Sequence, residues 1–85
     1  MQAILAVFRS RAQTLDFVSR LQKVGVSASA VSTPKEANVG CGISARLSPF
    51  DLGRAKRALA CGNYCAFVGF FRMENKYGRI FVYPA

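Results

Sequence analysis

Three cysteines are the residues of this 85-residue chain best suited to chemistry, because the sequence contains no histidine and only four acidic residues. Without histidine, neither the Cys–His pair of thiol proteases nor a Ser–His–Asp triad can form. A cysteine can still act by itself, since its thiolate form is a nucleophile. The composition therefore argues against an enzyme with acid–base or hydrolytic chemistry and leaves a reactive thiol as the chemistry to look for.

Cys41 is the best candidate among the three thiols, because it lies between Gly40 and Gly42. Flanking glycines permit backbone conformations with positive φ and leave the sulfur unshielded. Positive charge from a helix N-terminus or from basic side chains favours the thiolate. The candidate basic residues are Arg9, Arg11, Lys35 and Arg46. We predict a reactive thiol at Cys41; the alternative is a cysteine that fills a gap beneath its loop.

Cys61 and Cys65 are separated by three residues. Zinc sites and redox pairs favour a spacing of two residues, so this pair does not predict a metal site. The two cysteines are candidates for thiols that resolve an oxidised Cys41, or for partly buried structural residues. An odd number of cysteines without a disulfide framework indicates a reducing compartment, and we expect the cytoplasm.

The elements that position these thiols follow from the apolar pattern. Strands are expected at 3–9, 26–31, 43–48, 66–73 and 79–83, with a loop at 32–42. Helices are expected between the cap Ser10 and the stop Gly25, and between the cap Ser48 and the stop Gly62. The expected buried stripe of the first helix is Ala12, Leu15, Val18, Leu21 and Val24. The expected stripe of the second helix is Leu52, Ala55 and Leu59, with Phe50 near its start.

This order, β-α-β-β-α-β with one further strand, predicts an α+β protein. We expect a single domain over residues 1–85, with a ferredoxin-like two-layer sandwich and an extra C-terminal hairpin strand. Two helices would cover one face of an antiparallel sheet. Right-handed connections would then bring all three cysteines to the end of the sheet where the first helix begins.

The segment T-P-K-E-A-N-V-G-C-G, with V-F-R-S after the first strand, resembles a small bacterial family of selenium/sulfur carrier-like proteins. The matching positions are Phe8, Ser10, Gly25, Thr33, Pro34, Lys35, Cys41 and Gly42. The resemblance covers about residues 3–72. It implies a ferredoxin-like fold and a carrier role for Cys41, as a transient persulfide or selenosulfide without a resident cofactor or metal. The residues expected to support Cys41 are Gly40, Gly42, Thr33, Pro34, Lys35, Ser10, Arg9 and Arg11. Its partners would be proteins that donate and accept sulfur or selenium.

The net charge of +8, from twelve basic and four acidic residues, favours anionic partners. The segment A-F-V-G-F matches the second half of an RNA-recognition signature, whose first half fails at Asn63, Tyr64 and Cys65. Nucleic acid is therefore not the expected partner. The alternative to a carrier is a non-catalytic binding or regulatory module for an anion, RNA or a protein.

Apolar side chains occupy both faces of several predicted strands, as in Leu5/Val7 against Ile4/Phe8. Helices cover only one face of a two-layer sandwich, so the other face would expose a large apolar patch. We therefore expect a homodimer or higher oligomer, joined through the open sheet or the terminal hairpin. The apolar run near the N-terminus is too short for a signal peptide or a membrane span, so no membrane association is expected.

Overall fold

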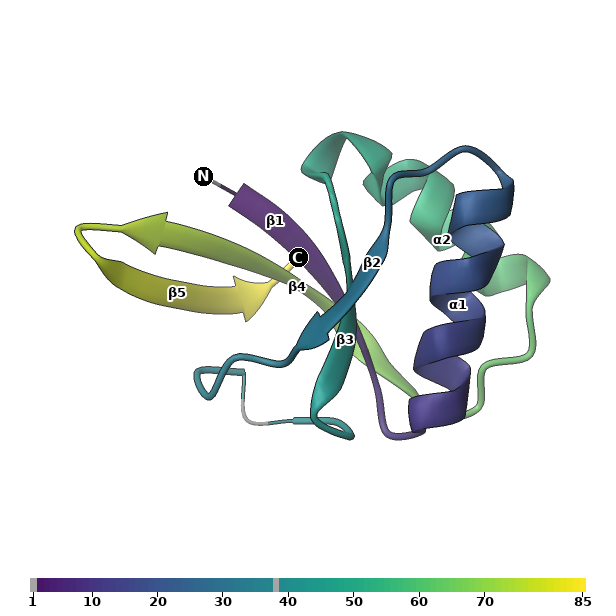
Figure 1. Cartoon of the computed structure of the whole chain (residues 1–85), viewed down its shortest axis with the longest axis horizontal. Coiled ribbons are helices and arrows are strands. Elements are labelled where there is room, and N and C mark those ends of the chain that lie inside the picture. Colours follow the sequence, from purple (N-terminus) through teal and green to yellow (C-terminus); the bar gives the residue numbers. More distant parts are fainter. Residues whose placement is uncertain (1, 38) are drawn as a thin grey trace.

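The computed structural model, which describes residues 2–37 and 39–85, contains a five-stranded antiparallel sheet with two helices against one face (Figure 1). The strands are β1 (Gln2–Phe8), β2 (Ser29–Ser32), β3 (Ile43–Leu47), β4 (Phe67–Lys76) and β5 (Arg79–Pro84). The helices are α1 (Arg11–Lys23) and α2 (Leu52–Cys61), with a 3₁₀ turn at Pro49–Asp51 before α2. The predicted α+β class, with two helices and an antiparallel sheet, is confirmed.

The strands lie in the order β2-β3-β1-β4-β5, and all neighbouring strands are antiparallel. β1 is therefore central, and β5 forms an outer edge beside β4. The β4–β5 turn consists of Tyr77 and Gly78, with φ of 54° and 71°, as a two-residue hairpin of type I′ requires. We expected a longer turn from Glu74 to Gly78; in the structure, β4 continues to Lys76 because it pairs with Arg79.

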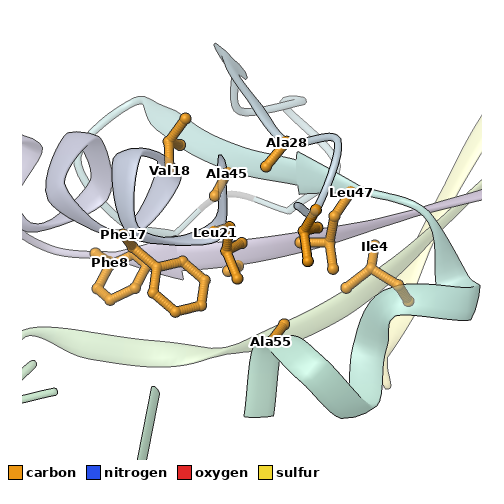
Figure 2. Close-up of a cluster of buried hydrophobic side chains, with 11 residues drawn as sticks. Ile4, Phe8, Phe17, Val18, Leu21, Ala28, Ala45, Leu47 and Ala55 are labelled. Carbon is orange, nitrogen blue, oxygen red and sulfur yellow. The ribbon is translucent and has the colours of Figure 1, made fainter. Parts of the chain in front are cut away.

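The hydrophobic core lies between the sheet and the helices (Figure 2). The rings of Phe8 in β1 and Phe17 in α1 pack together at a centroid distance of 5.3 Å. Tyr64, which follows α2, packs edge-on against both rings at 5.5 and 5.4 Å. The start of α1 is thus fixed against the end of β1, which is the corner where the Cys41 loop arrives.

The buried face of α1 differs from the expected stripe. Its buried residues are Thr14, Phe17, Val18 and Leu21, whereas Leu15 and Val24 are about half exposed. A helix turns by about 100° per residue, so a step of three residues drifts by about 60° each time and cannot stay on one face. The burial instead follows steps of three and four residues.

The start of the second helical segment also differs. Phe50 lies in the 3₁₀ turn with its side chain 97% exposed, so it is not part of the buried stripe. Ala55 is buried, and Leu52 and Leu59 pack partly buried against the core, as expected. The tighter 3₁₀ turn places side chains three residues apart in line with each other. Phe50 is therefore out of phase with the inward face of α2.

The helix-free face of the sheet is less open than the sequence indicated. Leu5 and Val7 point to this face, yet both are fully buried. Val7 lies under Gly40 of the β2–β3 loop, and Leu5 lies opposite Phe71 of β4 in the strand register. The half-exposed apolar side chains are instead on β5: Ile80, Phe81 and Tyr83. Within the described residues, the structure contains no helix with the length and hydrophobicity that a membrane crossing requires.

Candidate functional site

The loop that carries Cys41 crosses the end of β1 through Gly40. A Cβ atom at Gly40 would lie 2.5 Å from Val7 Cγ1 and 2.9 Å from the Phe8 carbonyl oxygen, so only glycine fits without a shift. Its φ of +85° also favours glycine. The next residue donates its backbone N–H to that same Phe8 oxygen, at 3.0 Å from Cys41 N. The loop thus passes close over the sheet end and is fixed there.

The Cys41 sulfur lies on the helix-bearing side, beside the first turn of α1. Its Sγ is 3.7 Å from Thr14 Oγ1 and 3.6 Å from the Ile43 carbonyl oxygen. The side chain is partly buried, whereas Thr14 is fully buried. Gly42, with φ of +96°, has open space where a Cβ would lie, so the other flank of the cysteine is uncovered. The sulfur therefore contacts Thr14 and Ile43 on one side, and the glycine that follows it does not cover the other side.

Thr14 gives the Cys41 thiol a polar neighbour whose hydroxyl is itself hydrogen-bonded. The Thr14 hydroxyl donates to the Ser10 carbonyl oxygen at 2.9 Å. Its single hydrogen is then in use, so the Cys41 thiol donates to the Ile43 carbonyl oxygen or to the Thr14 oxygen.

Ser10 caps α1 and fixes Thr14 in place. The Ser10 hydroxyl accepts the Gln13 backbone N–H at 3.2 Å, and the Ser10 carbonyl oxygen accepts the Thr14 backbone N–H at 3.0 Å. Arg9 and Arg11, on either side of Ser10, have exposed side chains. Among the described residues, neither arginine forms an ion pair or a hydrogen bond to Cys41. Their charge therefore acts on this corner through solvent, where screening reduces it.

Cys65 lies at the same corner, on the other side of the helix start. Its sulfur accepts a hydrogen bond from Gln13 Nε2 at 3.3 Å, and Gln13 Oε1 accepts the Ala66 backbone N–H at 3.0 Å. The Arg9 N–H donates to the Ala66 carbonyl oxygen at 2.8 Å. The peptide group between Phe8 and Arg9 thus bonds the Cys41 loop through its oxygen and the Cys65 segment through its N–H.

Cys61 is in different surroundings. It is exposed at the end of α2 and lines a groove between the helices with Arg20, in the last turn of α1, and Val24, which caps the end of α1. The structure therefore brings Cys65, but not Cys61, to the turn of α1 that contacts Cys41. All three cysteines are free.

The Thr33–Lys35 segment supports the loop from the opposite side. The Thr33 backbone N–H donates to the Gly42 carbonyl oxygen at 2.9 Å, and the Thr33 hydroxyl lies 2.6 Å from the Ser44 hydroxyl oxygen. With Pro34 and Lys35, it lines a hollow of about 620 Å³ on the helix-free face, where Arg46 also lies. Lys35 and Arg46 thus border this hollow, and neither makes a hydrogen bond to the Cys41 sulfur within the described chain.

Neither Thr14 nor Gln13, the two side chains that contact the sulfurs of this corner, was predicted to belong to the site. The available signal was a polar residue on the buried face of a helix. Thr14 lies three residues before Phe17 and seven before Leu21, which places it on that face at a helical period of 3.6. Across residues 2–37 and 39–85, no cluster of three or more cysteine or acidic side chains has the arrangement of a metal site.

Comparison with known families identifies this chain through the region that builds the corner. Residues 3–64 match the family described as "Putative Se/S carrier protein-like". The chain belongs to this family. The match includes Ser10, Thr14 and the whole loop with Cys41; it ends one residue before Cys65, so β4 and β5 lie outside it. No match was found among curated proteins or solved structures.

Proposed function

We propose that this protein carries sulfur or selenium on Cys41. The observation that carries the proposal is the position of this thiol: it lies within the family match, on a glycine-flanked loop, with its sulfur next to the Thr14 hydroxyl. A carrier needs a thiol that partner proteins can reach and that is stabilised when it is charged, and it needs no enclosed substrate pocket. Cys41 is partly exposed, which gives access, and the Thr14 hydroxyl beside it can stabilise the charge.

The proposed reaction is an exchange between thiols and needs no external oxidant. The Cys41 thiolate attacks the outer sulfur of a persulfide on a donor protein, R–S–SH. A new S–S bond forms on Cys41, the bond within the donor persulfide breaks, and the donor leaves as a thiolate. An acceptor nucleophile then attacks the outer sulfur and releases Cys41 as a thiolate. Selenium would move in the same way, as a selenosulfide with selenium in the outer position.

Thr14 would stabilise the Cys41 thiolate at two points of the transfer cycle. Its hydroxyl can donate to the Cys41 sulfur before loading and again when the cargo leaves, because each step begins or ends with negative charge on that atom. Gly40 would keep the loop close to β1, so that the sulfur and Thr14 stay within reach. Their proposed roles are therefore positioning the thiol and stabilising its charge.

Cys65 is our candidate for a resolving thiol. Its thiolate would attack the inner sulfur of the Cys41 persulfide, form a Cys41–Cys65 disulfide and release hydrosulfide. The shared attachment of both segments to the Phe8–Arg9 peptide group supports Cys65 over Cys61. Free thiols of this kind persist in a reducing compartment, and we propose the cytoplasm.

The experiment is to incubate the protein with a cysteine desulfurase and cysteine, and then to measure intact mass and map peptides without reduction. The proposal expects one added sulfur atom on Cys41 and none in Cys41→Ser. Sulfur spread equally over the three cysteines, or none on Cys41, would refute the carrier role. If sulfur is gained without any Cys41–Cys65 disulfide, the carrier role stands and the resolving role fails.

We also propose a ferredoxin-like assignment for the fold. The chain contains two βαβ units, β1-α1-β2 and β3-α2-β4. In the sheet, β3 of the second unit lies between β1 and β2, and β1 of the first unit lies between β3 and β4. This interleaving supports the assignment. β5 is then an addition at the free edge of β4.

A second copy of the chain is the partner we propose for β5. This strand is the outer edge of the sheet, and its half-exposed apolar side chains favour pairing. Antiparallel pairing of two β5 strands is two-fold symmetric. If Phe81 faces Phe81 of the partner copy, each Arg79 lies opposite a Tyr83, so the only charged residues of the two strands stay at opposite ends.

A further inference from the structure

The groove between the two helices, far along α1 from Thr14, has a lining that the carrier role does not use. It has a volume of about 360 Å³, and its lining residues are Arg20, Val24, Arg54, Arg57, Ala58 and Cys61. Four of these residues belong to α2. Arg57, Ala58 and Cys61 follow Arg54 by three, four and seven residues, so the four share one face of the helix. That face would normally be apolar where it borders another helix. Here it presents two guanidinium groups and a thiol.

The arginines of α2 have no acidic partner within the described chain. The ion pair that the described residues form lies elsewhere, between Lys76 and Glu74. Neither Arg54 nor Arg57 donates a side-chain hydrogen bond to another described residue, and both are exposed. Arginines that converge on a groove without carboxylates repel one another, and an anion between them would remove that repulsion.

Arg20, on the α1 side of the groove, is held in place. Its Nε donates to the Tyr64 hydroxyl oxygen at 3.0 Å, and its guanidinium carbon lies 5.9 Å from the centre of the Tyr64 ring. Tyr64 donates in turn to Asp16 Oδ2 at 2.7 Å. Burial, followed by the hydrogen bond to Asp16, raises the pKa of Tyr64 above its usual range, so this hydroxyl stays protonated. The two terminal nitrogens of Arg20 remain for an acceptor in the groove.

The local charge favours an anion even after the helix dipoles are counted. The last turns of both helices border the groove, and each helix C-terminus acts as about half a negative charge. Three arginines therefore outweigh about one negative charge. No carboxylate lines the groove among the described residues, and Asp16 of α1 already accepts the Tyr64 hydroxyl.

We propose that this groove binds a small organic phosphate. Guanidinium groups bond phosphate oxygens in pairs, and Val24 and Ala58 offer an apolar surface for the rest of the ligand. The volume lies within the range of small-molecule sites, about 300–1,000 Å³. A nucleotide has both features, phosphate groups and a flat, weakly polar base. The site is separate from Cys41, so the inference stands whether or not Cys41 carries sulfur.

Cys61 makes this inference testable, because an occupied groove would shield its exposed thiol. The experiment measures the rate at which iodoacetamide, a neutral reagent, alkylates each cysteine in the presence of ATP, inorganic phosphate or a short single-stranded RNA. With a Kd of about 1 mM, ATP at about 5 mM should slow Cys61 alkylation about sixfold. Inorganic phosphate should give weaker protection. Cys65 is exposed outside the groove and should keep its rate.

Two variants test the arginines. Arg57→Gln should raise the Kd for ATP about tenfold, because charge-assisted hydrogen bonds are lost, so that about 5 mM ATP slows Cys61 alkylation only about 1.5-fold. Lys56→Gln is the matched control: it removes the same charge from the neighbouring exposed residue, which does not line the groove. It should leave protection within about twofold. Equal losses in the two variants, protection by RNA alone, or no protection by ATP or phosphate would each overturn the proposal.

Discussion

Replacing Gly40 with alanine should destabilise the protein through two separate costs. A left-handed backbone conformation costs a non-glycine residue about 1–2 kcal/mol. The new Cβ would also meet Val7 Cγ1 at 2.5 Å and the Phe8 carbonyl oxygen at 2.9 Å. Overpacking of this kind costs about 1–3 kcal/mol. We expect Gly40→Ala to lower the free energy of unfolding by about 2–5 kcal/mol, the sum of these two costs.

Gly42→Ala provides the matched control. Gly42 also has positive φ, but its Cβ would meet nothing within 4 Å, so the variant carries the first cost alone. Urea denaturation should therefore place Gly42→Ala about 1–3 kcal/mol above Gly40→Ala in stability. The Cys41 thiol should also alkylate at a changed rate in Gly40→Ala, since its backbone anchor to Phe8 is displaced. Equal unfolding free energies for the two variants would show that the close crossing over β1 does not constrain the loop.

Three further predictions address the thiol, the hairpin and assembly. Thr14→Val should slow iodoacetamide alkylation of Cys41 near neutral pH by about tenfold, because the thiolate loses a hydrogen-bond donor. The Tyr83 hydroxyl, followed by Lys76, holds the pKa of Glu74 below its usual value, so this stabilisation is present at neutral pH and is lost as the pH falls through that lowered pKa. Tyr83→Phe should therefore be less stable than the wild type at neutral pH, and the gap measured by urea denaturation should close in acid. Phe81→Lys should shift the mass measured by light scattering from an oligomer to a monomer, if β5 is the contact between copies.

Each of these changes has a control within the chain. Thr14→Ser keeps the hydroxyl and should retain most of the Cys41 rate; a rate as low as that of Thr14→Val would assign the effect to packing. A Tyr83→Phe stability gap that persists in acid would contradict the Glu74 interpretation. Phe50→Lys introduces the same charge at an exposed position outside β5 and should leave assembly unchanged. A wild-type monomer at micromolar concentration would refute the assembly proposal itself.

Much of the backbone could be predicted because local signals were strong. The unbroken apolar run from Ala3 to Phe8 predicted a strand, and β1 is the central strand. The cap Ser10 predicted the start of α1, where the Ser10 hydroxyl accepts the Gln13 N–H. Boundaries were less accurate where the neighbouring strand decides them. β4 runs three residues beyond its expected end because its pairing with β5 extends to Lys76.

The site was harder to predict than the fold, because its contacts join segments that are distant in sequence. Cys41 and its glycines were visible from composition and spacing, whereas Thr14 was hidden by the expected three-residue stripe of α1. The arginine-lined groove was also missed, because Arg20 and Arg57 belong to different helices and only tertiary packing brings them together. Coverage of Val7 by the loop likewise depends on Gly40, whose neighbour in space is a strand more than thirty residues away.

The peptide group between Phe8 and Arg9 links the mechanics of the two cysteine segments. This group is planar and rigid, so its oxygen and its N–H cannot move independently. A displacement of this peptide group therefore disturbs the bond to Cys41 and the bond to Ala66 together. Moving it costs two hydrogen bonds, about 1–3 kcal/mol, whereas detaching the loop alone costs one. A change that shifts this one peptide group would loosen both cysteine-bearing segments at once.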